Sequence, residues 1–228
     1  MSNWNIKELF SPVRYKTVDV DDSIQSILFE NETYLGRSTE VFAYLGVPPS
    51  PEGQSLPGMV CVHGGGGPAF RQWVELWVKR GYAAISMDLS GRDGSGTRLA
   101  TSGPEQDHQA KFSTTSDWKD MWTYQAIAAV VRANSLLRHI STVDPSRIGI
   151  TSISWGGYLT CIASGIDLRF ACAIPVYGCG FLQQNSADDW MQISADMSLG
   201  QRQEWHDKSA SLCLPSVSIY ANAIRVRY

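Results

Sequence analysis

Long apolar runs are missing from this 228-residue sequence. No window approaches the roughly 18 consecutive apolar residues of a membrane-spanning helix. The first residues, Met-Ser-Asn-Trp-Asn-Ile-Lys, also lack the basic segment and apolar stretch of a secretory signal. An excess of charge is missing too, because the net charge is only −3 at pH 7. We therefore expect a globular cytoplasmic protein with neither a membrane nor a nucleic acid as its partner.

Cysteine clusters are missing as well. The chain has five cysteines, an odd number, and their spacing is not that of a metal site. Most of them lie in apolar surroundings, which predicts reduced core residues. The sequence gives no sign of a metal or of a cofactor. The cysteines are Cys61, Cys161, Cys172, Cys179 and Cys213.

Residues 13–47 contain short apolar runs that partly alternate with polar residues. The runs at 24–29 and 39–45 are separated by turn-forming residues, such as those at 21–22 and 31–33. Alternating runs with turns between them predict a small antiparallel meander.

Strand and helix patterns alternate from residue 58 onward. A long polar segment covers residues 89–116, and a loop of this length without regular structure usually has a function. Asp117, which follows it, can cap a helix. The alternation predicts an α/β fold in one domain, 1–228, with a mostly parallel sheet and helices on both faces. The expected strands are 58–63, 82–88, 147–153, 169–177 and 216–220, and the expected helices are 69–80, 118–140 and 155–164, with one or two more within 183–210.

One predicted strand leads directly into a tight turn that carries a serine. The segment Ser152-Ile-Ser154-Trp-Gly156 is the nucleophile-elbow pattern, with Ser152 in place of the first glycine. Small residues here let the strand turn sharply into a helix. A serine is a poor nucleophile unless the backbone holds it out beside a base and an oxyanion site. Ser154 is therefore the candidate nucleophile of a serine hydrolase.

A glycine run is the second part of this candidate site. The segment His63-Gly-Gly-Gly-Gly67 follows a buried strand, and such a backbone can come close to a ligand with its N–H groups. In elbow-type hydrolases one oxyanion donor is the residue after the nucleophile, here Trp155, and the other comes from a loop of this kind. A phosphate-binding loop or a plain turn is the alternative. The order of the two motifs favours an oxyanion loop, with His63 bracing it.

The remaining histidines and acids are weaker candidates. Asp88 ends a predicted strand and is expected to brace the neighbouring loop, with a role as catalytic acid as the alternative. His108 lies in the long polar loop, and His139 ends a helix, where a cation complements the dipole. His206 follows the elbow, but no strand-end acid precedes it, so a surface or bracing role is expected. The glycines at 91–96 lack the spacing of a dinucleotide site.

With these motifs in view, the chain resembles the α/β-hydrolase superfamily, in the acetylxylan-esterase and dienelactone-hydrolase-like branch that adjoins the prolyl oligopeptidase group. The resemblance implies Ser154 as the nucleophile and backbone donors around Gly64, Gly65 and Trp155. It also implies hydrolysis of a carboxylic ester, such as a small acyl group on a carbohydrate, with no metal or cofactor. The matching segments, within about 40–210, are 62–67, 80–88, 143–150, 154–158 and 175–181.

The resemblance departs near the C-terminus. Family members carry an acidic residue after a strand like 216–220 and a histidine further on, whereas no Asp, Glu or His follows Asp207 here. We therefore expect a C-terminally truncated member without the triad acid and base, whose activity is doubtful. Two alternatives stay open: a serine peptidase of the prolyl oligopeptidase type, and a non-catalytic pseudo-hydrolase fragment. The oligomeric state does not follow from the sequence.

Overall fold

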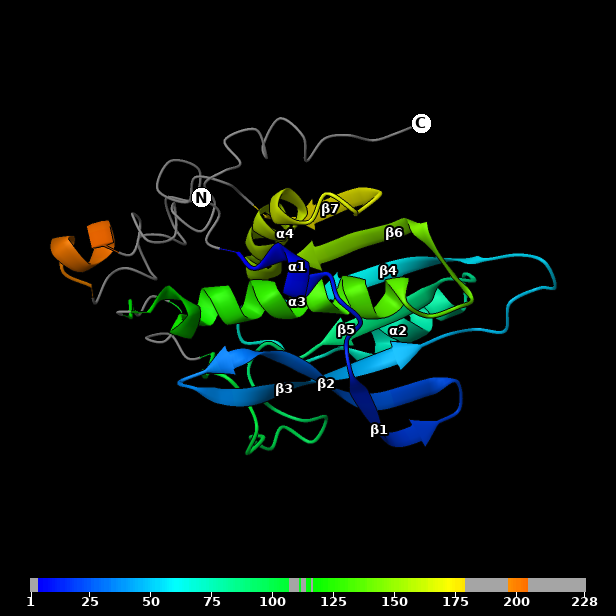
Figure 1. The fold of residues 1–228 in the computed structure, drawn as a ribbon, viewed down its shortest axis with the longest axis horizontal. Coiled ribbons are helices and arrows are strands. Elements are labelled where there is room, and N and C mark those ends of the chain that lie inside the picture. Colours follow the sequence, from blue (N-terminus) through cyan, green and yellow to red (C-terminus); the bar gives the residue numbers. More distant parts are fainter. Residues whose placement is uncertain (1–3, 107–110, 112–113, 116, 179–196, 205–228) are drawn as a thin grey trace.

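The computed structural model describes residues 4–106, 111, 114–115, 117–178 and 197–204. They form a seven-stranded mixed sheet in the order β1-β2-β3-β5-β4-β6-β7, with helices on both faces (Figure 1). Within the segment predicted to contain further helices, residues 199–204 are helical. The strand predicted at 216–220, together with His108, His206, Cys179 and Cys213, lies outside the described residues.

The three N-terminal strands form the predicted antiparallel meander. They are β1 (Tyr15–Asp21), β2 (Ile24–Tyr34) and β3 (Arg37–Gly46). β2 pairs antiparallel with both of its neighbours, and alternate apolar residues along it, such as Ile27 and Phe29, are fully buried. β3 then pairs antiparallel with β5, which joins the meander to the rest of the sheet.

The other four strands run parallel to one another. They are β4 (Leu56–Val62), β5 (Ala83–Met87), β6 (Val143–Ile153) and β7 (Cys172–Val176). Their registers pair Val62 with Met87 and with Ser152, and Ile153 with Val176. The four carboxyl ends therefore meet at one edge of the sheet, where ligands bind in open α/β sheets.

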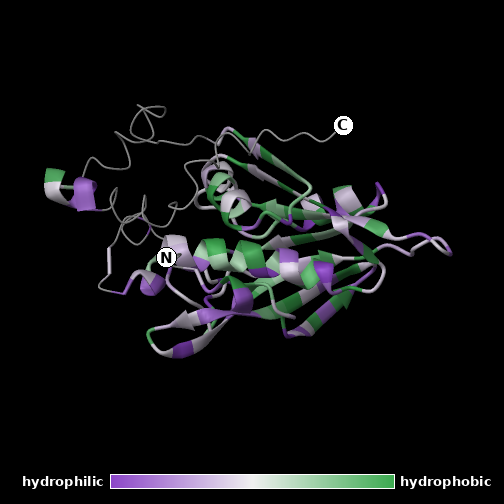
Figure 2. Cartoon of the chain, turned by 45° about the horizontal axis from the view of Figure 1, so that its top comes forward, coloured by the Kyte–Doolittle hydropathy of each residue, from purple (hydrophilic) through white to green (hydrophobic). Residues whose placement is uncertain are grey.

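Helices cover both faces of the parallel strands. Met59 and Cys61 of β4 pack in one cluster with Val74 of α2 (Arg71–Val78). The alternate residues of β4 point into the main core, which contains α3 (Trp122–Arg138) and α4 (Trp155–Ile166). The short α1 (Ile6–Leu9) contacts α3. Figure 2 shows hydrophobic residues along the central strands and the helices next to them.

The start of the long helix differs from the sequence-based expectation. Residues Trp118–Asp120 form a separate 3-10 turn, η2, and α3 begins only at Trp122. Asp117 therefore caps η2 and not α3: its Oδ1 accepts from the Lys119 N–H at 3.0 Å. The break follows from Met121, which is extended at φ −72° and ψ 139°.

The described cysteines agree with the expectation of reduced core residues. Cys61 and Cys161 are buried and free, and Cys172 is free and half-buried. Burial raises the pKa of the Cys61 thiol to about 12. A buried thiol of this kind stays protonated and behaves as a small apolar side chain.

Candidate active site

Ser154 occupies the sharp turn between β6 and α4. β6 ends at Ile153 and α4 begins at Trp155, so this serine alone joins the two elements. Its backbone has φ 56° and ψ −124°, a conformation that costs a residue with a side chain roughly 1–3 kcal/mol. Its N–H donates to the Val176 carbonyl oxygen at 2.8 Å, and its own carbonyl oxygen accepts from the Gly157 N–H at 2.7 Å. The serine is exposed at the carboxyl edge of the sheet.

Two glycines allow the first turn of α4 to pack against the sheet edge. A β-carbon on Gly156 would lie 2.4 Å from the His63 carbonyl oxygen and 2.6 Å from that of Val62. A β-carbon on Gly157 would lie 2.4 Å from the Gly178 Cα. These distances exclude any side chain at either position without a backbone shift. The small residues of the motif are therefore required by close packing with the neighbouring strand ends.

The glycine loop after β4 lies against this turn. A β-carbon on Gly64 would lie 3.4 Å from the Ser154 Cβ, and one on Gly65 would lie 3.5 Å from the Trp155 Cβ. Trp155 is the first residue of α4, and the N–H groups of a helix N-terminus favour a nearby negative charge. The structure thus brings together the four residues singled out from the sequence, Gly64, Gly65, Ser154 and Trp155.

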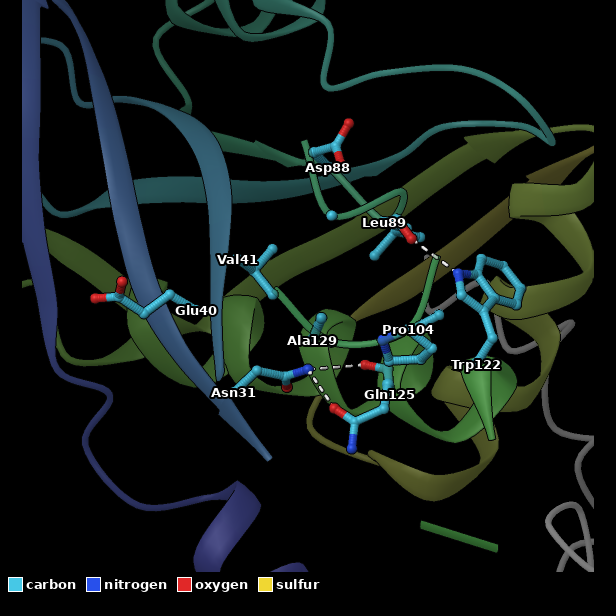
Figure 3. Close-up of a pocket in the computed structure, with 12 residues that line it drawn as sticks. Asn31, Glu40, Val41, Asp88, Leu89, Pro104, Trp122, Gln125 and Ala129 are labelled. Carbon is cyan, nitrogen blue, oxygen red and sulfur yellow. Dashed lines mark hydrogen bonds between the residues drawn. The ribbon is translucent and has the colours of Figure 1, made fainter. Parts of the chain in front are cut away.

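His63 braces the glycine loop through both of its ring nitrogens. Its Nε2 lies 2.9 Å from the Leu89 nitrogen and accepts that N–H, so the ring proton is on Nδ1. Nδ1 then donates to the Gly64 carbonyl oxygen at 2.7 Å. Leu89 is held from the other side, because the Trp122 indole Nε1 donates to its carbonyl oxygen at 2.8 Å (Figure 3). Helix α3 is thereby linked to the glycine loop.

The ring of His63 is held in its neutral form. Burial lowers the pKa of His63, and this outweighs the attraction of Asp88 for the protonated ring. A neutral imidazole with both nitrogens engaged is not available as a base for Ser154. The bracing role predicted for His63 agrees with this geometry.

Asp88 likewise braces its own loop. Its Oδ1 accepts from the Ser90 N–H at 2.8 Å and from the Arg92 N–H at 2.9 Å. Asp88 lies beside a cavity of about 30 Å³. Figure 3 shows it with Asn31 and Trp122, which also line this cavity. A space of this size holds a water or two and no ester substrate. The sequence-based preference for bracing over catalysis at Asp88 agrees with these contacts.

His139 lies far from the candidate nucleophile. It is the C-cap of α3, and its Nδ1 lies 2.7 Å from the Ser135 carbonyl oxygen. β6 begins shortly after it, at Val143, and ends at Ile153, and the seven residues of β4 that lie opposite β6 span roughly 23 Å. Within the described residues, neither His63 nor His139 is therefore placed to accept the Ser154 proton.

Clustered metal ligands and membrane-spanning helices are two features that the described part of the chain does not contain. No group of three or more histidine, cysteine, aspartate or glutamate side chains gathers there as a metal site. No helix of those residues is both long and apolar enough to cross a membrane.

One known sequence family matches this chain. The profile of the family described as Acetyl xylan esterase (AXE1) matches residues 5–186. A comparison with curated protein sequences gives no match. The family match covers most of the chain.

Solved structures give the same fold. Acetyl xylan esterase from Paenibacillus sp. R4 is similar with a TM-score of 0.64 and 23% identity, over 92% of this chain and 70% of that one. Acetyl xylan esterase 1 from Thermoanaerobacterium sp. JW/SL YS485 has a TM-score of 0.56 and 13% identity, over 92% and 73%. A glucuronoyl esterase from Solibacter usitatus has a TM-score of 0.52 and 12% identity, over 85% and 64%.

At these identities the structural likeness establishes the α/β-hydrolase fold, and the family match establishes the ancestry. Both agree with the resemblance inferred from the motifs. The chain belongs to the acetyl xylan esterase (AXE1) family, and it is by descent an esterase-type hydrolase with the α/β-hydrolase fold.

Proposed function

We propose that this protein is a serine esterase that removes a small acyl group, such as acetyl, from a carbohydrate. The observation that carries the proposal is the exposed, strained Ser154 turn, which lies against the Gly64–Gly65 loop. Strain of this kind persists only where the surrounding structure holds it, and it concentrates at functional sites. The substrate class is supported by the family and by the similar structures, whose names are those of carbohydrate esterases.

The proposed reaction begins with attack of the Ser154 Oγ on the ester carbonyl carbon. As the Oγ–C bond forms, the π electron pair moves to the carbonyl oxygen. The resulting oxyanion accepts hydrogen bonds from the Trp155 N–H and from the Gly64–Gly65 backbone. Collapse of this intermediate expels the alcohol, which takes up a proton, and leaves an acyl group on Ser154. Water then attacks the acyl carbonyl, and the acid departs as the serine regains its proton.

The serine proton must also be accepted. Neither His63 nor His139 among the described residues is placed to take it. We propose that water, which reaches the exposed Ser154, accepts it. Attack is then slow, because removing a triad member from a serine protease leaves only about 10³–10⁴-fold catalysis over water. The chain is therefore expected to acylate measurably but to turn over poorly.

Labelling with a fluorophosphonate probe tests the nucleophile. We expect covalent labelling of the wild type and none of Ser154→Ala. Ser164→Ala is the matched control, because Ser164 lies in the same helix and its hydroxyl donates to the Cys161 carbonyl oxygen. Equal labelling of wild type and Ser154→Ala would refute the assignment. A folded wild type without any labelling would favour the non-catalytic alternative.

The choice between ester and peptide substrates needs a second assay. Release of p-nitrophenol from p-nitrophenyl acetate, lost in Ser154→Ala, is the expected result. Release of p-nitroaniline from a prolyl-peptide anilide at a comparable rate would favour the peptidase alternative instead.

A further inference from the structure

A lysine from the long loop after β5 reaches the glycine loop. A β-carbon on Gly65 would lie 3.0 Å from the Lys111 Nζ and 3.5 Å from the Trp155 Cβ. The ammonium group therefore lies next to the loop and close to the first residue of α4. These are the elements whose backbone N–H groups are proposed as oxyanion donors.

The positive charge of Lys111 also acts on the histidine beneath the loop. Burial is the main cause of the lowered pKa of His63, and the charge of Lys111 acts in the same direction. Lys111 is half-buried, so its field is screened less than that of a fully exposed lysine. A cation in this position attracts a negative charge that develops at the mouth of the glycine loop.

We propose that the Lys111 ammonium is a further catalytic group that stabilises the oxyanion formed when Ser154 attacks. This inference rests on the proposed function. A full negative charge exists on the substrate oxygen only after the attack, so a cation beside it binds the transition state more strongly than the ester. Such differential binding raises the rate of acylation and not merely the affinity for substrate.

A different role for the same lysine would be that of the base, as in serine–lysine hydrolases. The position of the ammonium beside Gly65, on the side of the donor loop, favours the electrostatic role. The two roles make different demands on the side chain. An arginine keeps the charge but cannot give up a proton at ordinary pH, so it supports the first role and not the second.

The rate constant for fluorophosphonate labelling tests the proposal. In that reaction the Ser154 Oγ–phosphorus bond forms, fluoride leaves with its electron pair, and the serine proton passes to solvent. We expect Lys111→Met to label roughly 10- to 100-fold more slowly, a smaller loss than that of a fully buried oxyanion donor. Lys111→Arg should recover most of the rate. Lys119→Met, which removes an exposed lysine of η2, should label like the wild type.

Several outcomes would overturn the proposal. One is labelling of Lys111→Met at the wild-type rate. Another is an equal loss in Lys111→Arg and Lys111→Met, with a wild-type rate that rises as a lysine deprotonates, since that pattern belongs to a base. Equal labelling of Ser154→Ala would refute the proposed function and not the position of the charge.

A binding measurement separates the two failures, because it needs no reaction at Ser154. Phenylphosphonate carries a tetrahedral anionic group, and its affinity can be measured by calorimetry in the wild type and in Ser154→Ala. Replacing Lys111 with methionine should weaken that affinity about tenfold in both backgrounds. An unchanged affinity would refute the inference even if the wild type never labels.

Discussion

Replacing Gly156 with alanine should force the elbow away from the end of β4. The new β-carbon would lie 2.4 Å from the His63 carbonyl oxygen and 2.6 Å from that of Val62, about 1 Å inside an ordinary C···O contact. Both obstacles are backbone atoms at the end of a buried strand, so neither can swing aside. Overpacking costs about 1–3 kcal/mol, and we expect a value near 3 kcal/mol.

Urea denaturation measures this cost. With a slope of about 3 kcal/mol per M, the Gly156→Ala midpoint should fall by about 1 M. The labelling rate should fall as well, by up to about 100-fold, because a shift of 1 Å in a reacting group can cost that much.

Gly200 provides the control for this substitution. It lies in the helical segment 199–204, and a β-carbon there would have nothing within 4 Å. Gly200→Ala should leave the midpoint unchanged or raise the stability by up to about 1 kcal/mol. A wild-type midpoint for Gly156→Ala would refute the idea that the elbow depends on this close approach.

Three further predictions concern the backbone strain and the buried titratable groups. Ser154→Gly should be more stable than Ser154→Ala by about 1 kcal/mol in the free energy of unfolding, because glycine adopts the positive φ with less strain. It should therefore unfold at a higher urea concentration, and equal midpoints would argue against strain. The neutral ring of His63 should contribute stability above pH 6.5, its ordinary pKa, and lose it as the pH falls through the lower folded value; urea midpoints from pH 4 to 8, compared with His63→Gln, would show this as a flatter profile in the variant. The Cys61 thiol, whose pKa burial raises from 9.0 to about 12, should react with iodoacetamide only after unfolding, as mass spectrometry would reveal, and stability should fall above pH 9 less steeply in Cys61→Ala.

Much of the fold could be predicted because the parallel strands are continuous apolar runs. The strand expected at 82–88 is β5 at Ala83–Met87, and the one expected at 169–177 is β7 at Cys172–Val176. The start of α3 could not be placed. Trp118 fits the apolar periodicity of the helix, and only the extended backbone of Met121 separates it from α3.

Helix α1 could not be predicted from the sequence at all. Its four residues are too few to display a helical period, and such a short helix is marginal alone. Its burial comes from α3, since Leu9 is fully buried and its carbonyl oxygen accepts from the Ser135 hydroxyl, 126 residues away. Contacts of this range leave no local pattern in the sequence.

Some parts of the candidate site could also be predicted from the sequence, and others could not. The Ser154 turn and the glycine loop are local motifs, so their positions could be inferred from spacing alone. The hydrogen bonds that hold the glycine loop could not be inferred in this way, because they join residues that are far apart in the chain. The Leu89 N–H donates to His63, 26 residues away, and the Trp122 indole donates to the Leu89 carbonyl oxygen, 33 residues away. The approach of Lys111 to Gly65 could not be inferred either, because the two residues are far apart in the chain and a single lysine in a polar segment carries no signal of the contact.

The backbone geometry of the Ser154 turn does not depend on the group that accepts the serine proton. The strain at Ser154 is of the order of 1–3 kcal/mol, and it is opposed by contacts from three sides: the Val176 carbonyl, the carbonyl of His63 against Gly156, and Gly178 against Gly157. All of these lie within residues 62–178, between strand ends that are fixed by the parallel register. A base supplies a proton acceptor but none of this geometry. The strand ends and the first turn of α4 are therefore sufficient to present the serine. Under the proposed function, the identity of the proton acceptor sets the rate at which it reacts.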